Sequence, residues 1–329
     1  MKLVSIVVPA YNENECITAL VDSISEVFKP LNYNYELVIV DDGSKDNTFD
    51  IIRQNAQSNS SVKGIRLSRN MGHQAALDCG LKHASGDAII SMDADLQHPP
   101  SIIPKMLELW EDGYEIVTTQ KLENQEAGIM YKIFSKSFYS LFNKYSQIKL
   151  TPNGSDFRLM SRRSLDAVLS MPEYHRFYRG LVPFVGFKST SISFDVQKRH
   201  AGKRKYNFKQ SMRLASDGLF SFSDFALKVP FYLGGLVFLI MLGYLLFTLI
   251  DYVFLGGMFV RGWTSVIIIL TISISMQLMF MGVMGVYIGK IFFEVKRRPV
   301  FFTSDKVGNF NVQQKPYADS SEVLIKEVV

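Results

Sequence analysis

Residues 88–100 read Ala-Ile-Ile-Ser-Met-Asp-Ala-Asp-Leu-Gln-His-Pro-Pro, an apolar run followed by two acids that are two positions apart. The run from Ala88 to Met92 has the length and the apolar content of a buried strand. Because side chains alternate along a strand, Asp93 and Asp95 are expected to project from the same face at its carboxyl end. Two converging carboxylates suit a hard divalent cation, whose other ligands are typically water and phosphate oxygens. The stretch therefore predicts a strand end that binds a metal ion and a nucleotide diphosphate.

Strands and helices are expected to alternate on both sides of this stretch. The expected strands are residues 3–8, 36–40, 64–67, 88–92 and 116–119, and the expected helices are residues 14–28, a helix through Ile51 and Ile52, residues 74–83 and residues 102–110. This alternation predicts a mainly parallel, doubly wound α/β sheet. Ligands of such sheets bind beyond the carboxyl ends of the strands, where the polar clusters at residues 11–13, 41–42 and 93–95 are expected to meet.

The composition of the chain changes in its last third. The whole sequence of 329 residues is 47% hydrophobic and has 25 Phe and 14 Met, which is high for a soluble protein. Residues 231–255 contain a single ionisable residue, Asp251, and residues 263–288 contain none. Each stretch exceeds the roughly 20 residues that a helix needs to cross the hydrocarbon core of a membrane. We therefore expect two membrane spans.

The link between the two expected spans, residues 256–262, is so short that the spans must form a hairpin with both chain ends on one side. The basic residues near the ends are Lys228 before the first span and Lys290, Lys296, Arg297 and Arg298 after the second, whereas Arg261 alone lies in the link. The positive-inside rule then places both termini in the cytoplasm, as expected of a multi-pass protein of the cell membrane. Cys16 and Cys79 would lie in a reducing compartment and need not pair.

The expected division of the chain is an α/β domain at residues 1–206, a juxtamembrane helix at 207–228, two spans within 229–289 and a cytoplasmic tail at 290–329. Residues 126–146 and 207–228 have amphipathic spacing. They are either core-facing helices or helices in the membrane interface that direct lysines toward the headgroups. Residues 303–329 are polar and are expected to be loosely ordered.

The strand-end clusters contain side chains that suit a nucleoside. Tyr11 can stack on a base, and Glu13 can accept hydrogen bonds from a base or a ribose. Asp41 and Asp42 can bind a pyrimidine ring nitrogen or a ribose hydroxyl. Turn formation is the alternative, since Asp-Gly-Ser at residues 42–44 is ordinary turn chemistry. The occurrence of three such clusters at successive strand ends favours binding over turn formation alone.

Phosphate charge has to be neutralised without a glycine-rich loop, because neither G-x-G-x-x-G nor a Walker-type motif occurs. A basic run without an acid comprises Lys198, Arg199, Lys203, Arg204, Lys205, Lys209 and Arg213. It can attract anionic lipids, at about 1 kcal/mol per residue near the surface, or it can grip a phosphate at the membrane plane. The two roles are compatible, and Arg199 and Lys205 are the expected direct contacts.

An acid and a base lie beside a glycine turn in residues 153–160, which read Asn-Gly-Ser-Asp-Phe-Arg-Leu-Met. Asp156 is a candidate general base or a residue that positions an acceptor. The alternative is an ion pair with Arg158. His73 and His98 flank the motifs and are expected to be packing or turn residues.

Three motifs in this order, Tyr-Asn-Glu at 11–13, Asp-Asp-Gly-Ser at 41–44 and Asp-Ala-Asp-Leu-Gln-His-Pro-Pro at 93–100, resemble those of family 2 glycosyltransferases with the Rossmann-like GT-A fold. The last motif, the basic segment from Arg199 to Lys205 and the two expected spans more narrowly resemble polyprenyl-phosphate glycosyltransferases. That branch includes dolichol-phosphate mannose synthases and bactoprenol glucosyltransferases. The resemblance covers residues 3 to about 300. Arg204 departs from it, since many relatives carry Ser there.

The resemblance implies a set of site residues. Those implied to contact the nucleotide are Pro9, Tyr11, Glu13, Asp41, Asp42 and Asp93. Asp93, Asp95 and Gln97 would surround Mg²⁺ or Mn²⁺. Asp156 and Asp95 would be catalytic. The acceptor phosphate would meet Arg158, Arg199 and Lys205.

The resemblance also implies an activity, the inverting transfer of one hexose from a UDP-sugar such as UDP-glucose to polyprenyl (undecaprenyl) phosphate. A processive membrane polysaccharide synthase is one alternative, although its Gln-x-x-Arg-Trp motif has only the partial match Gln-Ser-Met-Arg-Leu at residues 210–214. A non-catalytic sugar-lipid carrier is another. No nucleic-acid partner is expected. The small residues Gly285 and Gly289 permit close helix packing, which leaves a homo-oligomer open.

Overall fold

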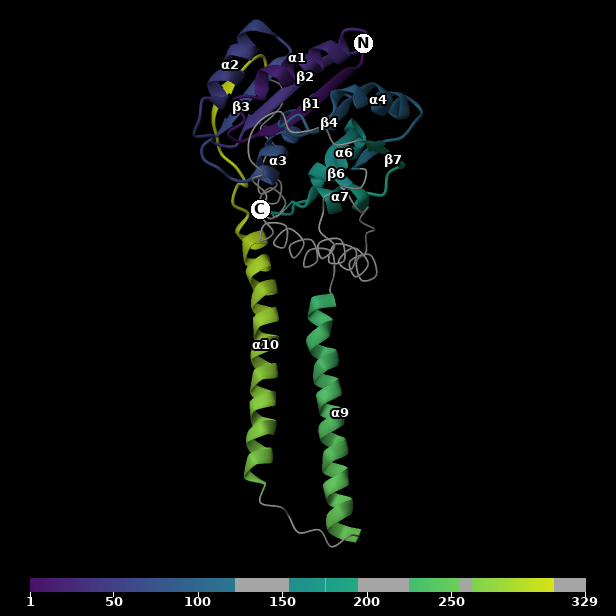
Figure 1. Ribbon diagram of the computed structural model, residues 1–329, viewed down its shortest axis with the longest axis vertical. Helices are drawn as coiled ribbons and strands as arrows, with labels where there is room; N and C mark the ends of the chain where they lie inside the picture. Colours follow the sequence, from purple (N-terminus) through teal and green to yellow (C-terminus); the bar gives the residue numbers. More distant parts are fainter. Residues whose placement is uncertain (122–153, 175, 195–224, 255–261, 311–329) are drawn as a thin grey trace, which may run out of the picture. The chain divides into compact units, whose positions relative to one another are not determined.

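The computed structural model describes residues 1–121, 154–174, 176–194, 225–254 and 262–310 (Figure 1). The chain divides into two compact units. The first comprises Met1–Tyr131, Leu150–Lys205 and Pro299–Val329, and the second comprises Lys132–Lys149 and Tyr206–Arg298. The predicted amphipathic helix at 126–146, most of the juxtamembrane helix at 207–228 and the basic run at 198–213 lie outside the described residues.

The first unit is built on an eight-stranded sheet with the order β7-β5-β6-β4-β1-β2-β3-β8. The strands are β1 (Leu3–Ala10), β2 (Asn34–Asp41), β3 (Val62–Leu67), β4 (Ala88–Ser91), β5 (Ile116–Lys121), β6 (Gly154–Ser161), β7 (Ser189–Phe194) and β8 (Thr303–Val307). Neighbouring strands among β3, β2, β1 and β4 pair in parallel, as do β5 and β7. β6 runs antiparallel to β4 and β5, and β8 runs antiparallel to β3. The predicted, mostly parallel α/β sheet is confirmed.

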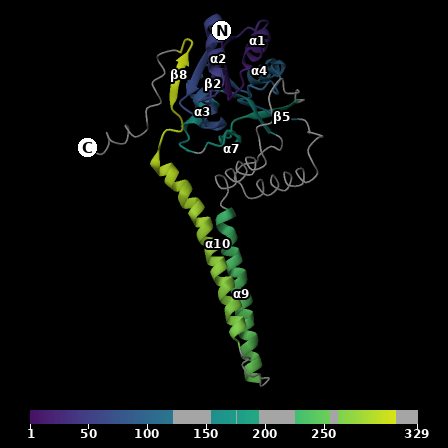
Figure 2. The ribbon, with the colours of Figure 1, turned by 60° about the vertical axis from the view of Figure 1, so that its left-hand side comes forward.

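Helices of the first unit follow the strands in alternation (Figure 2). They are α1 (Ile17–Phe28), α2 (Thr48–Ser58), α3 (His73–His83), the short 3₁₀ turn η1 (Pro100–Ile102), α4 (Ile103–Glu111), α6 (Arg162–Ser170) and α7 (Tyr178–Phe184). β1, β2 and β4 are central strands whose residues are almost all buried, because helices cover both faces of a doubly wound sheet. This explains why these strands are near-continuous apolar runs rather than alternating ones.

The register of the central strands brings their carboxyl ends to one edge of the sheet. Ala10 at the end of β1 pairs with Asp41 at the end of β2. Val7 of β1 pairs with Ser91 at the end of β4, and Ser91 in turn pairs with Arg158 of β6. The segments that carry the predicted site residues therefore leave the sheet side by side.

The last strand, β8, corrects one expectation. Residues 303–329 were expected to be loosely ordered, but Thr303–Val307 pairs with β3, with Gly64 opposite Val307. The segment is too short and too polar to show a strand pattern in the sequence. It forms because the outer edge of β3 offers unpaired backbone groups that an added strand can satisfy.

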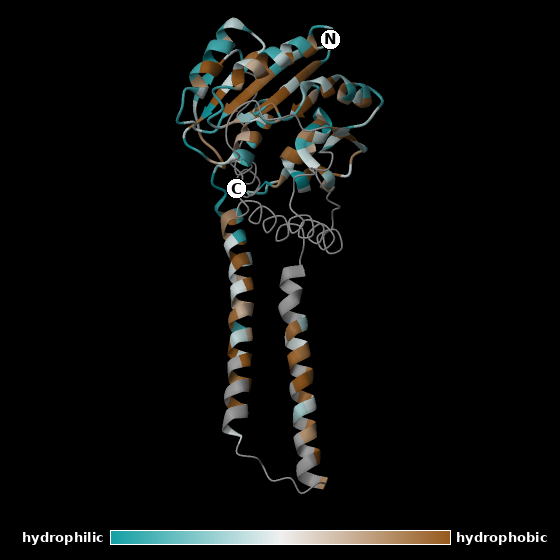
Figure 3. Ribbon diagram, in the orientation of Figure 1, coloured by the Kyte–Doolittle hydropathy of each residue, from teal (hydrophilic) through white to brown (hydrophobic). Residues whose placement is uncertain are grey.

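Two long helices make up the described part of the second unit, α9 (Phe225–Phe254) and α10 (Trp263–Lys296), which lie side by side (Figures 1 and 2). The predicted spans at 231–255 and 263–288 fall on them. Apolar residues predominate along both helices (Figure 3). Among the described residues, Ile272–Lys296 is the one stretch long and apolar enough to cross a membrane, with a mean hydropathy of 1.6, whereas the apolar stretch Tyr232–Tyr244 of α9 is shorter. The two-span hairpin remains a prediction.

A buried ion pair stabilises the amino-terminal half of the sheet. Glu36 of β2 and Lys63 of β3 are both buried, and their side chains lie 2.5 Å apart. The carboxylate of Glu36 also accepts hydrogen bonds from the Ser5 hydroxyl at 2.5 Å and from the backbone and side chain of Ser85 at 2.6 and 2.8 Å. Although desolvation raises the pKa of Glu36, these hydrogen bonds lower it more, and the net pKa lies below its ordinary value.

Replacing Lys63 by Met leaves Glu36 as a buried carboxylate without its cation. We expect the free energy of unfolding to fall by about 3–5 kcal/mol at neutral pH. The depressed pKa of Glu36 means that the wild-type pair stabilises the fold above the carboxylate's unfolded pKa, and that this contribution is lost as the pH falls through the folded pKa. The difference between wild type and Lys63→Met should therefore shrink in acid.

Thermal unfolding at a series of pH values from neutral to acid measures this difference. Lys105→Met is the matched control, because Lys105 forms an exposed pair with Glu108 at 2.8 Å and should contribute about 0–1 kcal/mol. A destabilisation by Lys63→Met that is independent of pH would show that Glu36 is not held as an anion.

Candidate functional site

The end of β2 places a fully buried carboxylate at the edge of the sheet. Oδ1 of Asp41 accepts a hydrogen bond from the backbone N–H of Ser44 at 2.9 Å, and Nε of Arg66 lies 3.4 Å from Oδ2. Desolvation raises the pKa of Asp41 despite these partners. Pro9, predicted to contact the nucleoside, is buried within the neighbouring strand β1. Nucleotide contacts of both residues remain predictions.

Asp42 joins the end of β2 to the loop before α3. Its carboxylate accepts backbone hydrogen bonds from Met71 at 2.7 Å and from Gly72 at 3.0 Å. Desolvation outweighs these bonds and raises the pKa of Asp42. The next residue, Gly43, has a φ of +64°, and a Cβ there would lie 2.5 Å from a backbone carbon of Arg69. The expected turn chemistry of this motif is thus present, and it requires glycine at position 43.

The loop after β1 is tied to the loop after β2. The backbone N–H of Asn12 donates to the Ser44 hydroxyl at 2.9 Å, and that of Glu13 donates to the Thr48 hydroxyl at 3.0 Å. Asn12 has a φ of 51°, a conformation that Asn adopts more readily than most residues. These contacts leave Tyr11 and Glu13 half-buried at the edge of the sheet. Their predicted roles toward a base and a ribose suit this position.

Asp93 and Asp95 lie in a turn rather than on the strand. β4 ends at Ser91, Leu96 adopts a φ of 61°, and the backbone N–H of Gln97 donates to Oδ1 of Asp95 at 3.1 Å. The expectation that strand alternation aligns the two carboxylates is therefore wrong. An Asx-type turn sets their spacing instead, because the side chain of Asp95 caps its own backbone two residues on.

The donor chemistry of this turn fits a hard divalent cation. The Asp93 side chain is 35% exposed, whereas Asp95 is buried. Among the residues that the structure describes, no group of three or more His, Cys, Asp or Glu side chains is placed to hold a metal ion. Carboxylate oxygens suit Mg²⁺ or Mn²⁺, and phosphate oxygens and waters commonly complete such a site. Asp93, Asp95 and Gln97 remain the predicted ligands.

His98 holds the turn in place from inside the protein. Its buried ring accepts a hydrogen bond at Nδ1 from the backbone N–H of Asp93, 3.0 Å away. Its Nε2 lies 2.7 Å from the Ser155 hydroxyl, and the ring stacks on Phe157 with centroids 5.2 Å apart. Nδ1 thus faces the turn that carries Asp93, and Nε2 faces β6. His98 is a packing and turn residue, as predicted.

His73 begins α3 and contacts the exposed acid directly. Its Nε2 lies 3.0 Å from Oδ1 of Asp93. Desolvation lowers the pKa of His73, but the hydrogen bond and negative charge of Asp93, together with the charge of Asp156, raise it overall. Desolvation raises the pKa of Asp93, but the imidazoles of His98 and His73 reverse the shift and hold that pKa below its ordinary value. His73 therefore contacts a predicted metal ligand directly, which goes beyond the packing or turn role predicted for it.

Asp156 of β6 is shared by two arginines. Its Oδ1 lies 2.6 Å from Nη2 of Arg158, and its Oδ2 lies 2.9 Å from Nη2 of Arg179. Nε of Arg179 adds a bond of 3.2 Å to Oδ1. Desolvation raises the pKa of Asp156, but the charges of Arg179 and Arg158 lower it well below its usual range. The ion pair considered as the alternative role of Asp156 is therefore present.

Arg158 is a core residue rather than a surface cation. Its side chain is 3% exposed, and it donates to the carbonyl oxygens of Tyr178 at 3.1 Å and Ser155 at 3.3 Å. This geometry gives Arg158 a structural role and lends no support to the predicted contact with an acceptor phosphate. Arg199 and Lys205, the other predicted contacts, lie outside the described residues.

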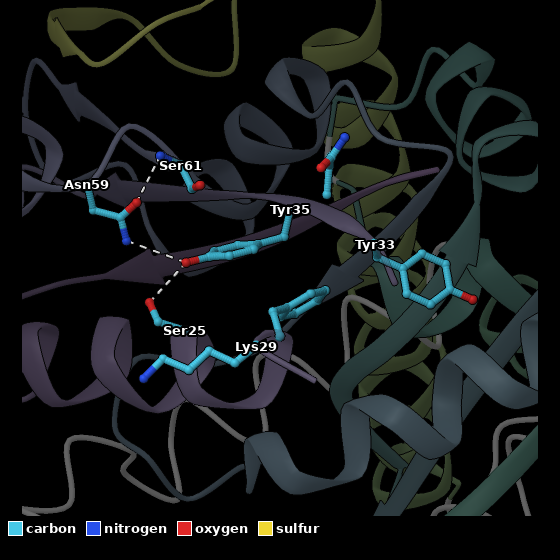
Figure 4. A pocket seen from close by; sticks show the side chains of 8 residues that line it. Ser25, Lys29, Tyr33, Tyr35, Asn59 and Ser61 are labelled. Carbon is cyan, nitrogen blue, oxygen red and sulfur yellow. Dashed lines mark hydrogen bonds between the residues drawn. The ribbon is translucent and has the colours of Figure 1, made fainter. Parts of the chain in front are cut away.

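A pocket of about 530 Å³ lies at the opposite, amino-terminal end of the strands, between the end of α1 and the start of β2. The Tyr35 hydroxyl there is hydrogen-bonded to Ser25 at 2.9 Å and to Asn59 at 3.4 Å (Figure 4). Its lining is Ser25, Phe28, Lys29, Tyr33, Asn34, Tyr35, Asn59 and Ser61. None of the predicted site residues is among them, so this pocket is separate from the candidate site.

The role of His98 can be tested by one substitution that keeps a hydrogen-bond acceptor near Nδ1 and one that removes both nitrogens. His98→Asn keeps an acceptor near Nδ1, whereas His98→Phe keeps only the ring. We expect His98→Phe to lose about 1–3 kcal/mol of stability, because the buried Asp93 N–H and Ser155 hydroxyl lose their partner. His98→Asn should lose less. Thermal unfolding and calorimetric titration with Mn²⁺ in the presence of UDP measure the two effects.

His83→Asn is the control, because His83 lies at the far end of α3 and its Nδ1 contacts the Cys79 carbonyl at 2.8 Å. This change should leave Mn²⁺ affinity unaltered. Wild-type stability together with wild-type Mn²⁺ affinity in His98→Phe would refute the positioning role.

Comparison with known proteins places the chain in a family. The model of glycosyl transferase family 2 matches residues 5–169. An uncharacterized glycosyltransferase of Synechocystis is 38% identical over 92% of this chain and 95% of that protein, and a prophage bactoprenol glucosyl transferase homolog of Escherichia coli is 36% identical over 91% and 97%. A crystal structure of glucosyl-3-phosphoglycerate synthase from Mycobacterium tuberculosis with Mn²⁺, UDP-glucose and phosphoglyceric acid aligns at 17% identity over 66% of this chain and 77% of that one, with a TM-score of 0.45. The family match over half of the chain and the two relatives over nearly all of it show that this protein belongs to glycosyl transferase family 2.

Proposed function

We propose that this protein transfers one hexose, glucose in the first instance, from a UDP-sugar to polyprenyl phosphate with inversion at the anomeric carbon. The observation that carries the proposal is the likeness to a bactoprenol glucosyl transferase homolog over 91% of the chain. This match reaches well beyond the family domain at residues 5–169 and so includes much of the apolar part of the chain. The acids at the carboxyl edge of the sheet supply the chemistry that such a reaction needs.

The donor would bind where the loops after β1, β2 and β4 meet. Tyr11 and Glu13 lie half-buried there, close to Asp41 at the end of the neighbouring strand. Asp93, Asp95 and Gln97 would hold Mg²⁺ or Mn²⁺. When bound, such an ion offsets the charge that develops on a departing nucleotide diphosphate. His73 and His98 keep Asp93 anionic and in place, so the carboxylate is ready to act as a ligand.

The acceptor itself supplies the nucleophile, a phosphate oxygen. The second pKa of a phosphate monoester is near ~6, so at neutral pH the group is largely dianionic and needs almost no deprotonation. Its oxygen would attack the anomeric carbon from the face opposite the leaving group, which inverts the configuration. Arg199 and Lys205 are proposed to meet this phosphate. A general base is dispensable in such a step, and the strongly anionic state of Asp156 suits an electrostatic role better.

A polyprenyl acceptor requires a site at a membrane. Ile272–Lys296 is long and apolar enough to cross one, and none of its most apolar window is buried inside the protein. We propose that α9 and α10 form the predicted hairpin, with both termini in the cytoplasm. Lysine and arginine are more frequent before α9 and after α10 than in the link between them, which supports this orientation.

Purified protein with labelled UDP-glucose, undecaprenyl phosphate and Mn²⁺ should yield one glucose per lipid. Asp95→Asn should lower the rate at least about 100-fold, because one charged ligand of the ion is lost. Asp50→Asn is the matched control, since Asp50 is exposed and pairs with Arg53 on the same helix.

Full transfer by Asp95→Asn would contradict the metal role. Polymeric product would indicate a polysaccharide synthase. UDP-glucose binding without turnover would indicate a carrier.

A further inference from the structure

We propose that Arg179 binds a phosphate oxyanion at the reacting centre and that the buried carboxylate of Asp156 positions it. The inference rests on the proposed function, because it names the side chain that meets one of the phosphates in that reaction. It assigns to Arg179 a role that the sequence motifs do not reveal, and it gives Asp156 a task other than proton transfer.

The two arginines that share Asp156 differ in access to solvent. The Arg158 side chain is 3% exposed, whereas that of Arg179 is 37% exposed. Backbone carbonyls also hold Arg158, which fixes its guanidinium in the core. Arg179 lies in the first turn of the short helix α7 and contacts Asp156 from the accessible side. An anion that approaches this cluster would therefore meet Arg179 first.

The contact with Asp156 is suited to hold a guanidinium in one orientation. Arg179 uses Nε at 3.2 Å and Nη2 at 2.9 Å, one to each carboxylate oxygen. Such two-point pairing fixes the plane of the guanidinium as well as its position. A guanidinium has five N–H donors, so an arginine that is held by a carboxylate can also bind an anion. Preorganised donors of this kind are what a reacting phosphate requires.

The charge of the cluster also favours an anion. One carboxylate, Asp156, is paired with two cations, Arg158 and Arg179, which leaves a net positive charge on the three side chains. The hydroxyl of Ser91, at the end of β4, donates to the Asp156 carbonyl at 2.6 Å and so ties β6 to the strand that leads into Asp93. This contact links the Asp156–Arg179 pair to the strand that leads into the expected diphosphate site.

Two phosphates of the reaction could be the ligand, the diphosphate of the donor or the monophosphate of the acceptor. Both present pairs of phosphate oxygens that the planar guanidinium of arginine binds through paired hydrogen bonds. Kinetics with each substrate varied separately distinguish them. Lys would keep the charge at position 179 but lose the two-point geometry.

The experiment compares Arg179→Ala and Arg179→Lys with wild type in the full-length, detergent-solubilised protein. KM and kcat are measured for undecaprenyl phosphate and for UDP-glucose, and the affinity for UDP is measured by calorimetry. We expect Arg179→Ala to raise the KM for one phosphate substrate or lower kcat/KM about 100-fold, and Arg179→Lys to recover part of the loss. Arg163→Ala is the control, because Arg163 is exposed and pairs with Glu115 at 3.2 Å.

A raised KM for undecaprenyl phosphate alone assigns the acceptor phosphate. A raised KM for UDP-glucose with weakened UDP binding assigns the donor diphosphate. Wild-type constants in Arg179→Ala would overturn the inference. The inference would also be overturned if Arg179→Ala and Arg179→Lys lost activity equally and both had a lowered unfolding temperature, because that result indicates a structural role. A wild-type protein that transfers no sugar would refute the proposed function instead, and UDP affinity would still test the donor arm.

Discussion

Four carboxylates, Asp41, Asp42, Asp93 and Asp156, are held at one edge of the sheet, and their mutual repulsion has to be offset for the protein to fold. Each acid has different partners. Asp41 contacts a turn amide and Arg66, and Asp42 accepts hydrogen bonds from two loop amides. Asp93 lies beside two imidazoles, and Asp156 is paired with two arginines. The pKa values of the four acids therefore shift in different directions. Desolvation dominates at Asp41 and Asp42, at the end of β2, and their pKa values rise. Neighbouring cations and imidazoles dominate at Asp93 and Asp156, and their pKa values fall.

This division separates two regions of the site. The acids after β2 bind backbone amides and shape the loops that would receive a nucleoside. Asp93 and Asp156 stay anionic, one half-exposed beside His73 and the other enclosed by arginines. Negative charge that is already balanced by fixed partners needs little rearrangement when a charged substrate enters. The edge of the sheet therefore combines a hydrogen-bonding region with a region of preorganised charge.

The central strands were predictable because β1, β2 and β4 are buried on both faces and appear as unbroken apolar runs. β6 was harder, since its buried Asp156 and Arg158 neutralise each other, and the sequence shows only two charges near a glycine. The turn at Asp93 and Asp95 was misjudged because the strand ends two residues earlier. His73 and Arg179 were missed as site residues because their partners are distant in sequence, 20 and 23 positions away. The signal available in the sequence was that each residue lies at the start of a helix, where side chains often face the carboxyl edge of the sheet.

The position of β8 in the chain determines when the sheet can be completed during synthesis. It follows α10 in the chain, yet it completes the sheet that begins with β1. A ribosome that has made the first two hundred residues has not yet made the segment that covers the outer edge of β3. That edge stays open, with unpaired amide and carbonyl groups, until both long helices have been synthesised. A fragment cut before α9 would carry the same open edge, so the isolated α/β unit should be prone to pair with copies of itself.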